Sequence, residues 1–261
     1  MDFVEVGVGA DLRRIATLRR PGKSPGLFWL GGYRSEMTGS KAEALDAYGA
    51  EKGLAVTRFD YSGHGQSGGD FRDGTISRWL EESLAVFALT EGPQVVVGSS
   101  MGGWLALLLA RQLRRQGIDR LKALILIAPA VDMTDVLMEQ QFTRKERQAM
   151  QQTGIVLQPS QYSDEPYPIT AGLIEDGRQH LMFGRGIDVG APVTILQGGN
   201  DPDVPREHAL KLVQHLLTDP VTFTLVPDGD HRLSREQDLE LLRAAVEREV
   251  SGPPEQLVLE L

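Results

Sequence analysis

Short apolar runs alternate with helical segments along most of this sequence, and this rhythm strongly constrains the fold. The runs expected to be strands are residues 27–30, 54–59, 94–97, 121–127, 193–197 and 222–226, with an edge pair at 3–6 and 15–18. Residues 94–97 read Gln-Val-Val-Val, and such a continuous apolar run is typical of a strand covered on both faces. Repeated strand–helix units therefore predict an α/β protein with a mostly parallel central sheet flanked by helices.

The stretch from 132 to 188 interrupts this rhythm. Residues 134–141 and 143–153 have charged, amphipathic helical patterns. We expect one core formed by residues 1–131 and 189–261. The stretch between them is then a helical cap over the carboxyl edge of the sheet, where ligands bind in such folds. The alternative is a long solvated connection, although loops of this length in compact domains are usually functional or disordered.

Composition excludes several classes of protein. The 261 residues contain 27 Lys and Arg against 36 Asp and Glu, and the formal net charge of −9 argues against nucleic acid or an anionic membrane as partner. The absence of cysteine excludes disulfides, thiolate metal sites and cysteine nucleophiles. The apolar runs are too short to span a bilayer, and no signal-peptide pattern opens the chain, so we expect a cytoplasmic protein.

A nucleophile motif lies between the strand expected at 94–97 and the helix expected at 104–116. Residues 98–102 read Gly-Ser-Ser-Met-Gly, which matches G-x-S-x-G with Ser100 at its centre. In a strand-to-helix turn this motif holds the serine in a strained backbone, and its glycines stand where neighbouring backbone passes close. We therefore predict Ser100 as a nucleophile. Ser99 lacks the glycine spacing, and a turn that only connects strand and helix is the alternative.

A serine hydroxyl needs a base, and the chain has five histidines. Where this nucleophile turn occurs, the partners follow in the order serine, acid, histidine. His231 lies after Ser100 in a loop that follows a predicted strand, whereas His208 and His215 lie within a predicted helix. The other two precede the serine or lie in the insertion. We therefore expect His231 to be the base.

The acid that orients the histidine is expected just after the strand at 193–197. Asp201 is the predicted residue, and its role is to fix the imidazole tautomer and stabilise the imidazolium. Asp203 is the rival, and its alternative role is to cap the helix near Pro205. Asp230, next to the histidine, is expected to form a turn.

The tetrahedral intermediate of acyl transfer needs two N–H donors. We expect one from Met101, the residue after the nucleophile, and the other from Tyr33 in a Gly-Gly-Tyr-Arg turn, with Gly32 as the near alternative. Gly32, Arg34 and Met138 are expected to contact substrate, since the turn faces the pocket mouth and methionine fills irregular apolar space. An equal alternative is that Met138 only packs the insertion onto the core.

The glycine-rich segment 63–69 lacks the Lys-Ser or Lys-Thr pair of a phosphate-binding loop. We expect it to be a structural loop near the site, where His64 helps to shape the pocket. No histidine or carboxylate cluster has metal-ligand spacing in the sequence, and the expected mechanism requires no metal or other cofactor.

Three strings of residues resemble the α/β-hydrolase family, and in particular the branch that contains mammalian mitochondrial hydrolases of S-acylated proteins and acyl-glucuronides. They are Phe-Asp-Tyr-Ser-Gly at 59–63, Gly-Ser-Ser-Met-Gly-Gly-Trp at 98–104 and Asp-His-Arg at 230–232. The resemblance extends over residues 27–246. It implies Ser100, Asp201 and His231 as the triad, and it adds Tyr162 in the insertion as a substrate contact.

The resemblance implies hydrolysis of acyl thioesters or carboxylic esters, with a small acyl substrate or an S-acylated protein as partner. The chain departs from the family at Gln197-Gly198, where His-Gly is frequent, and from the branch at Gly31-Gly32, where Pro-Gly is common. Neither departure removes a catalytic group. The fold also hosts hydrolases of C–C and amide bonds and inactive ligand-binding proteins, and these are the alternative functions.

Overall fold

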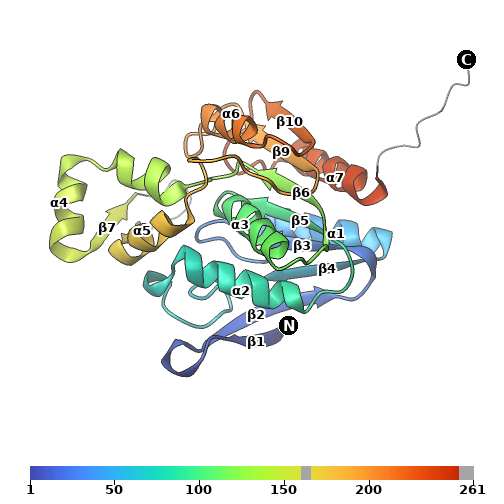
Figure 1. The fold of residues 1–261 in the computed structure, drawn as a ribbon, viewed down its shortest axis with the longest axis horizontal. Coiled ribbons are helices and arrows are strands. Elements are labelled where there is room, and N and C mark those ends of the chain that lie inside the picture. The colour runs from blue at the N-terminus through green and yellow to red at the C-terminus, as the bar shows by residue number, and fades with distance from the viewer. Residues whose placement is uncertain (160–165, 253–261) are drawn as a thin grey trace, which may run out of the picture.

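The computed structural model describes residues 1–159 and 166–252, and its centre is an eight-stranded sheet (Figure 1). In spatial order its strands are β1 (Asp2–Val6), β2 (Arg13–Arg20), β4 (Leu54–Phe59), β3 (Lys23–Leu30), β5 (Gln94–Ser99), β6 (Leu121–Ile127), β9 (Val193–Gly198) and β10 (Val221–Val226). β2 pairs antiparallel with β1 and with β4, and the other neighbours are parallel. The predicted α/β fold with a mostly parallel sheet is confirmed.

Helices cover both faces of this sheet (Figure 1). One face packs against α2 (Ile76–Ala88), α3 (Met101–Arg115) and α6 (Arg206–His215), and the other against α1 (Ser40–Lys52) and α7 (Glu236–Ser251). All residues of β5 are buried, because helices lie on both sides of it. This explains why its three valines follow one another without an alternation of polar residues.

The carboxyl ends of four parallel strands lead to the predicted site residues. β3 ends at Leu30, directly before the double glycine, and it pairs with β5 up to Gly98, the first residue of the serine motif. β9 and β10 end just before the loops that carry Asp201 and His231. Because parallel strands run in one direction, these ends meet along one edge of the sheet.

The described part of the 132–188 stretch forms elements outside the main sheet. They are a π-helical turn (Met133–Met138), a 3-10 turn (Glu139–Gln141), α4 (Arg144–Thr153), the antiparallel strands β7 (Ile155–Gln158) and β8 (Tyr167–Thr170), α5 (Ala171–Gly177) and a 3-10 turn (Arg178–His180). Figure 1 shows α4, β7 and α5 standing to one side of the sheet. Two further 3-10 turns, Gly9–Asp11 and Phe71–Asp73, lie in the first part of the chain.

Part of this insertion differs from the sequence prediction. One helix is predicted over 134–141, but the structure has a π-helical turn followed by a 3-10 turn. The segment begins at Asp132, whose φ is 56° and whose carboxylate accepts the N–H groups of Met182 (2.7 Å) and Phe183 (2.9 Å). A contact 50 residues away therefore fixes the start of this segment, and local helical periodicity does not contain that information.

Candidate active site

Ser100 occupies a strained turn between β5 and α3. Its φ of 55° and ψ of −119° are rare for a residue with a side chain. A Cβ on Gly98 would overlap the carbonyl oxygen of Gly102, and a Cβ on Gly102 would overlap that of Leu30. Both glycines are thus required by close backbone approach, which is the reason predicted for the motif.

Three side chains predicted from the sequence form one hydrogen-bonded chain. Ser100 Oγ lies 3.0 Å from His231 Nε2, and His231 Nδ1 lies 2.9 Å from Asp201 Oδ2. The side chain of Asp201 is fully buried and that of His231 is 15% exposed. The three residues follow β5, β9 and β10, which are distant in sequence. They come together because these strands end at the same edge of the sheet.

Each carboxylate oxygen of Asp201 accepts two hydrogen bonds. Oδ1 accepts the N–H groups of Asp203 (2.9 Å) and Val204 (2.8 Å), and Oδ2 accepts from His231 and from the side-chain amide of Gln197 (3.2 Å). The two backbone N–H groups and the amide NH2 group can only donate, so both oxygens of Asp201 act as acceptors. With the carboxylate accepting, His231 carries its proton on Nδ1 and leaves Nε2 free to accept a proton from the serine.

Gln197 is a supporting residue that the sequence did not assign. Its buried amide group donates to Asp201 Oδ2 and to the carbonyl oxygen of Val204 (2.9 Å). These two bonds tie the end of β9 to the acid loop. The only signal in the sequence was its place two residues before the loop, which does not indicate where its side chain points.

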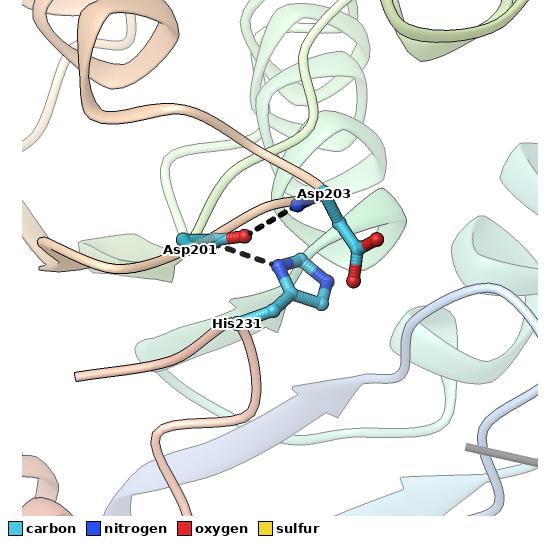
Figure 2. Close-up of side chains that lie close together, drawn as sticks. All are labelled: Asp201, Asp203 and His231. Carbon is cyan, nitrogen blue, oxygen red and sulfur yellow. Dashed lines mark hydrogen bonds and ion pairs between the residues drawn. The ribbon is translucent and has the colours of Figure 1, made fainter. Parts of the chain in front are cut away.

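Asp203 lies on the other side of the imidazole, as Figure 2 shows. Its backbone N–H donates to Asp201, and its carboxylate points toward His231. The interpretation of Asp203 as a helix cap is wrong, because α6 begins after Pro205 and has no side-chain cap bond. The loop that follows β9 is held instead by the backbone N–H groups of Asp203 and Val204, which donate to Asp201.

A metal ion could also be held here. Among residues 1–159 and 166–252, the only group of three or more His, Asp or Glu side chains close enough to bind one consists of Asp201, Asp203 and His231. One ligand atom of each lies within 4.8 Å of the others. Sequence spacing did not reveal this cluster, because the fold brings a distant histidine to two neighbouring carboxylates. His231 already uses one nitrogen for Asp201 and the other for Ser100, so a metal here would displace the hydrogen-bonded chain.

The loop that carries His231 is held from two sides. Asp230 accepts the N–H of Leu233 (2.9 Å), a turn of the kind expected for it. The ammonium group of Lys41, at the start of α1, donates to the carbonyl oxygen of Arg232. Burial lowers the pKa of Lys41 to about 8. The histidine loop is therefore anchored to a helix on the far face of the sheet.

The turn after β3 lies against the serine. A Cβ on Gly32 would stand 3.3 Å from Ser100 Cβ, so only glycine allows this approach without displacement. Tyr33 and Arg34 turn their side chains toward β8. The Tyr33 hydroxyl donates to the carbonyl oxygen of Pro168 (2.6 Å), and an Arg34 guanidinium N–H donates to that of Pro166 (3.2 Å).

The other two residues predicted to contact substrate are Met138 and Tyr162, both in the insertion. Met138 is 9% exposed and packs in the hydrophobic core that joins the insertion to the main domain. This agrees with its packing alternative, and its contact with substrate stays a prediction. Tyr162 lies outside the described residues.

Comparison with known proteins decides the family. A model of the alpha/beta hydrolase family matches residues 24–245. The chain belongs to the α/β-hydrolase family. Its curated relatives include "palmitoyl-protein thioesterase ABHD10, mitochondrial", which is 35% identical over 234 residues in Bos taurus and 34% identical over 236 residues in Homo sapiens. Each match covers 89% of this chain and 75% of the relative.

Solved hydrolases of the family have the same architecture. A putative hydrolase from Agrobacterium vitis S4 is 50% identical, with a TM-score of 0.92 over 95% of this chain and 98% of its own. The alpha/beta hydrolase domain-containing protein 10 from mouse is 30% identical, with a TM-score of 0.85 over 96% and 99% of the two chains. The resemblance inferred from three short strings is thereby confirmed.

The names of the curated relatives place those proteins in mitochondria, and the cytoplasmic location expected for this chain stays a prediction. Within the described residues, no helix is both long and apolar enough to cross a membrane.

Proposed function

We propose that this hydrolase cleaves carboxylic esters or thioesters through an acyl-enzyme on Ser100, with His231 as base and Asp201 as the orienting acid. The observation that carries the proposal is the continuous hydrogen-bonded chain from Ser100 Oγ through the imidazole to the buried Asp201 carboxylate. A buried, oriented acid next to a serine–histidine pair is the arrangement that nucleophilic acyl transfer requires.

In the first half-reaction, Ser100 Oγ attacks the acyl carbonyl carbon as its proton passes to His231 Nε2. The tetrahedral intermediate then collapses, the bond to the leaving group breaks, and the imidazolium gives its proton to the departing thiol or alcohol. In the second half-reaction, water attacks the acyl-enzyme, His231 takes a proton from that water and returns it to Ser100, and the carboxylic acid leaves. Asp201 stabilises the imidazolium in both halves without taking a proton.

The oxyanion of the intermediate is proposed to bind the N–H groups of Met101 and Tyr33. Met101 is the first residue of α3, where backbone N–H groups lack partners within the helix and the helix dipole is positive. Tyr33 lies in the turn next to Ser100. Two donors fixed before the reaction stabilise the developing charge more than water does.

The substrate is proposed to be a long-chain acyl ester or thioester, including S-acylated proteins, by analogy with the thioesterase relatives. The insertion at 132–188 is proposed to act as the cap that binds the acyl chain. It contributes the buried side chains of Met133 and Met138 and the half-buried Leu137 and Met150 to the shared apolar core. Methionine side chains adapt to apolar chains of different shape, which suits such a role.

The test is hydrolysis of matched oxygen esters and thioesters of increasing acyl length by the wild type, Ser100→Ala and Ser99→Ala. Ser99 is the matched control, since its hydroxyl is adjacent but has no place in the chain of bonds to His231. Loss of turnover in Ser100→Ala alone supports the proposal. Full activity of Ser100→Ala would refute it. If the wild type does not turn over any of these substrates and does not react with a serine-directed phosphonate, the protein is a binding protein instead.

A further inference from the structure

His64 is buried beside the turn that follows β3, in a glycine-rich loop whose role the proposed chemistry leaves open. It is 4% exposed and is enclosed by the rings of Tyr61, Phe71 and Trp79, whose centroids lie 5.5, 5.0 and 5.3 Å from its own. The imidazole therefore has little freedom to rotate. A polar ring held this tightly in an apolar cage needs partners for both nitrogens.

Both nitrogens have partners, and the partners determine the tautomer. His64 Nε2 lies 3.1 Å from the backbone N–H of Arg34, which can only donate, so Nε2 must accept. Nδ1 then carries the proton and donates to the carbonyl oxygen of Ser62 at 3.1 Å. Burial lowers the pKa of His64 to about 4, so this neutral form persists at neutral pH.

The amide of Arg34 belongs to a tight turn beside the serine. Ser35 N–H donates to the carbonyl oxygen of Gly32 (3.1 Å), which places Tyr33 and Arg34 at the two central positions. Arg34 has a φ of 58°, whereas Tyr33 is not among the residues with positive φ. This is the pattern of a type II turn, in which glycine is usual at the position that Arg34 occupies.

A side chain at that position is strained, because L-residues disfavour the left-handed backbone. Rotation of the central peptide by half a turn would convert the turn to type I and relieve the strain. It would also direct the Arg34 N–H away from the imidazole and reverse the carbonyl group of Tyr33, so the turn would lose its bond to the core. The bond to His64 opposes this rotation.

We propose that His64 is a positioning residue for the oxyanion hole: by accepting the Arg34 N–H, it anchors the turn to the core and thereby keeps the preceding peptide, which carries the N–H of Tyr33, in place. The inference rests on the proposed function, in which Tyr33 is an oxyanion donor. The bonds of the Tyr33 side chain to Pro168 in β8 and of the Arg34 side chain to Pro166 just before it hold the same turn from the side of the insertion. His64 supplies the contact from the core.

Two substitutions separate the two nitrogens of His64. In His64→Gln, the longer amide can present an acceptor near the position of Nε2, toward Arg34. In His64→Asn, the shorter amide can reach only the position of Nδ1, toward Ser62. We expect His64→Gln to keep kcat within about threefold of wild type and His64→Asn to lose about 30-fold, somewhat less than removal of an oxyanion donor itself. KM should change little in both, and an alkyl boronate that forms a tetrahedral adduct should bind His64→Asn more weakly by a similar factor.

A rescue experiment distinguishes positioning from a general loss of packing. Glycine at position 34 prefers the left-handed backbone, so Arg34→Gly should restore much of the kcat that His64→Asn loses. Equal losses in both His64 variants without rescue, or wild-type kcat in His64→Asn, would overturn the inference. Ser100→Ala tests the proposed function separately, because a dead Ser100→Ala with a fully active His64→Asn leaves that function intact and removes only the role of His64.

Discussion

Asp201 holds His231 with one carboxylate oxygen and its own loop with the other. Oδ2 lies 2.9 Å from His231 Nδ1, while Oδ1 accepts two backbone N–H groups from the loop that leads to α6. The carboxylate therefore cannot rotate without breaking bonds on both sides. The orientation of the imidazole is set by the folding of the acid loop.

This arrangement predicts the effect of Asp201→Asn. The amide oxygen would keep the place of Oδ1, where it accepts the backbone N–H groups, and the NH2 group would then face His231 Nδ1. A donor there favours the tautomer with the proton on Nε2, which cannot take the serine proton. We expect kcat to fall by about 10³–10⁴-fold with the fold intact.

Asp203→Asn is the matched control for that experiment, because its carboxylate also faces the imidazole but is exposed. We expect its kcat to stay within about fivefold of wild type, since exposed charges interact weakly. Steady-state kinetics and thermal melting of both variants check this. A larger loss of kcat in Asp203→Asn than in Asp201→Asn would show that Asp203, and not Asp201, is the orienting acid.

Gln197→Leu should destabilise the protein, because it leaves the buried carbonyl oxygen of Val204 without the amide donor and removes one bond to Asp201. We expect a loss of about 1–3 kcal/mol in the free energy of unfolding, measured by urea titration. Gln197→His keeps an N–H donor at this position and should lose less. Equal losses in the two variants would contradict a specific role for the hydrogen bonds.

Gly102→Ala should greatly reduce both the stability and the activity of the protein. The new Cβ would meet the carbonyl oxygens of Leu30 and Gly31 at the base of the turn beside Ser100, and backbone cannot yield as a side chain does. We expect a loss of more than about 3 kcal/mol in stability and of nearly all turnover. Gly184→Ala is the control, since a Cβ there meets nothing within 4 Å, and it should retain both stability and activity.

The acid dependence of stability should report on His64. Burial lowers its pKa from 6.5 to about 4. Between these values the unfolded chain binds a proton that the folded protein does not, so the free energy of unfolding falls as pH drops through this window. From pH 7 to 4.5, wild type should lose about 2 kcal/mol more than His64→Gln. His208 has a similarly lowered pKa in both proteins, so its contribution cancels. Parallel pH curves would show that His64 does not titrate in this way.

Local chemistry in the sequence determined much of this protein. The valine run of β5 identifies a strand buried on both faces, and the G-x-S-x-G motif requires a strained strand-to-helix turn at Ser100. The chain order of Ser100, Asp201 and His231, combined with loop positions after strands, was sufficient to select all three side chains that the fold joins by hydrogen bonds. Each of these signals depends on neighbours within a few residues.

Only the tertiary structure decided how the support around them is built. The bond by which Asp201 orients His231 joins two loops that are 30 residues apart. The bond from Arg34 to His64 spans 30 residues, and the bond from Tyr33 to β8 spans 135. Such contacts form between segments whose local patterns are unrelated, so no periodicity or motif contains them until the sheet has brought the segments together.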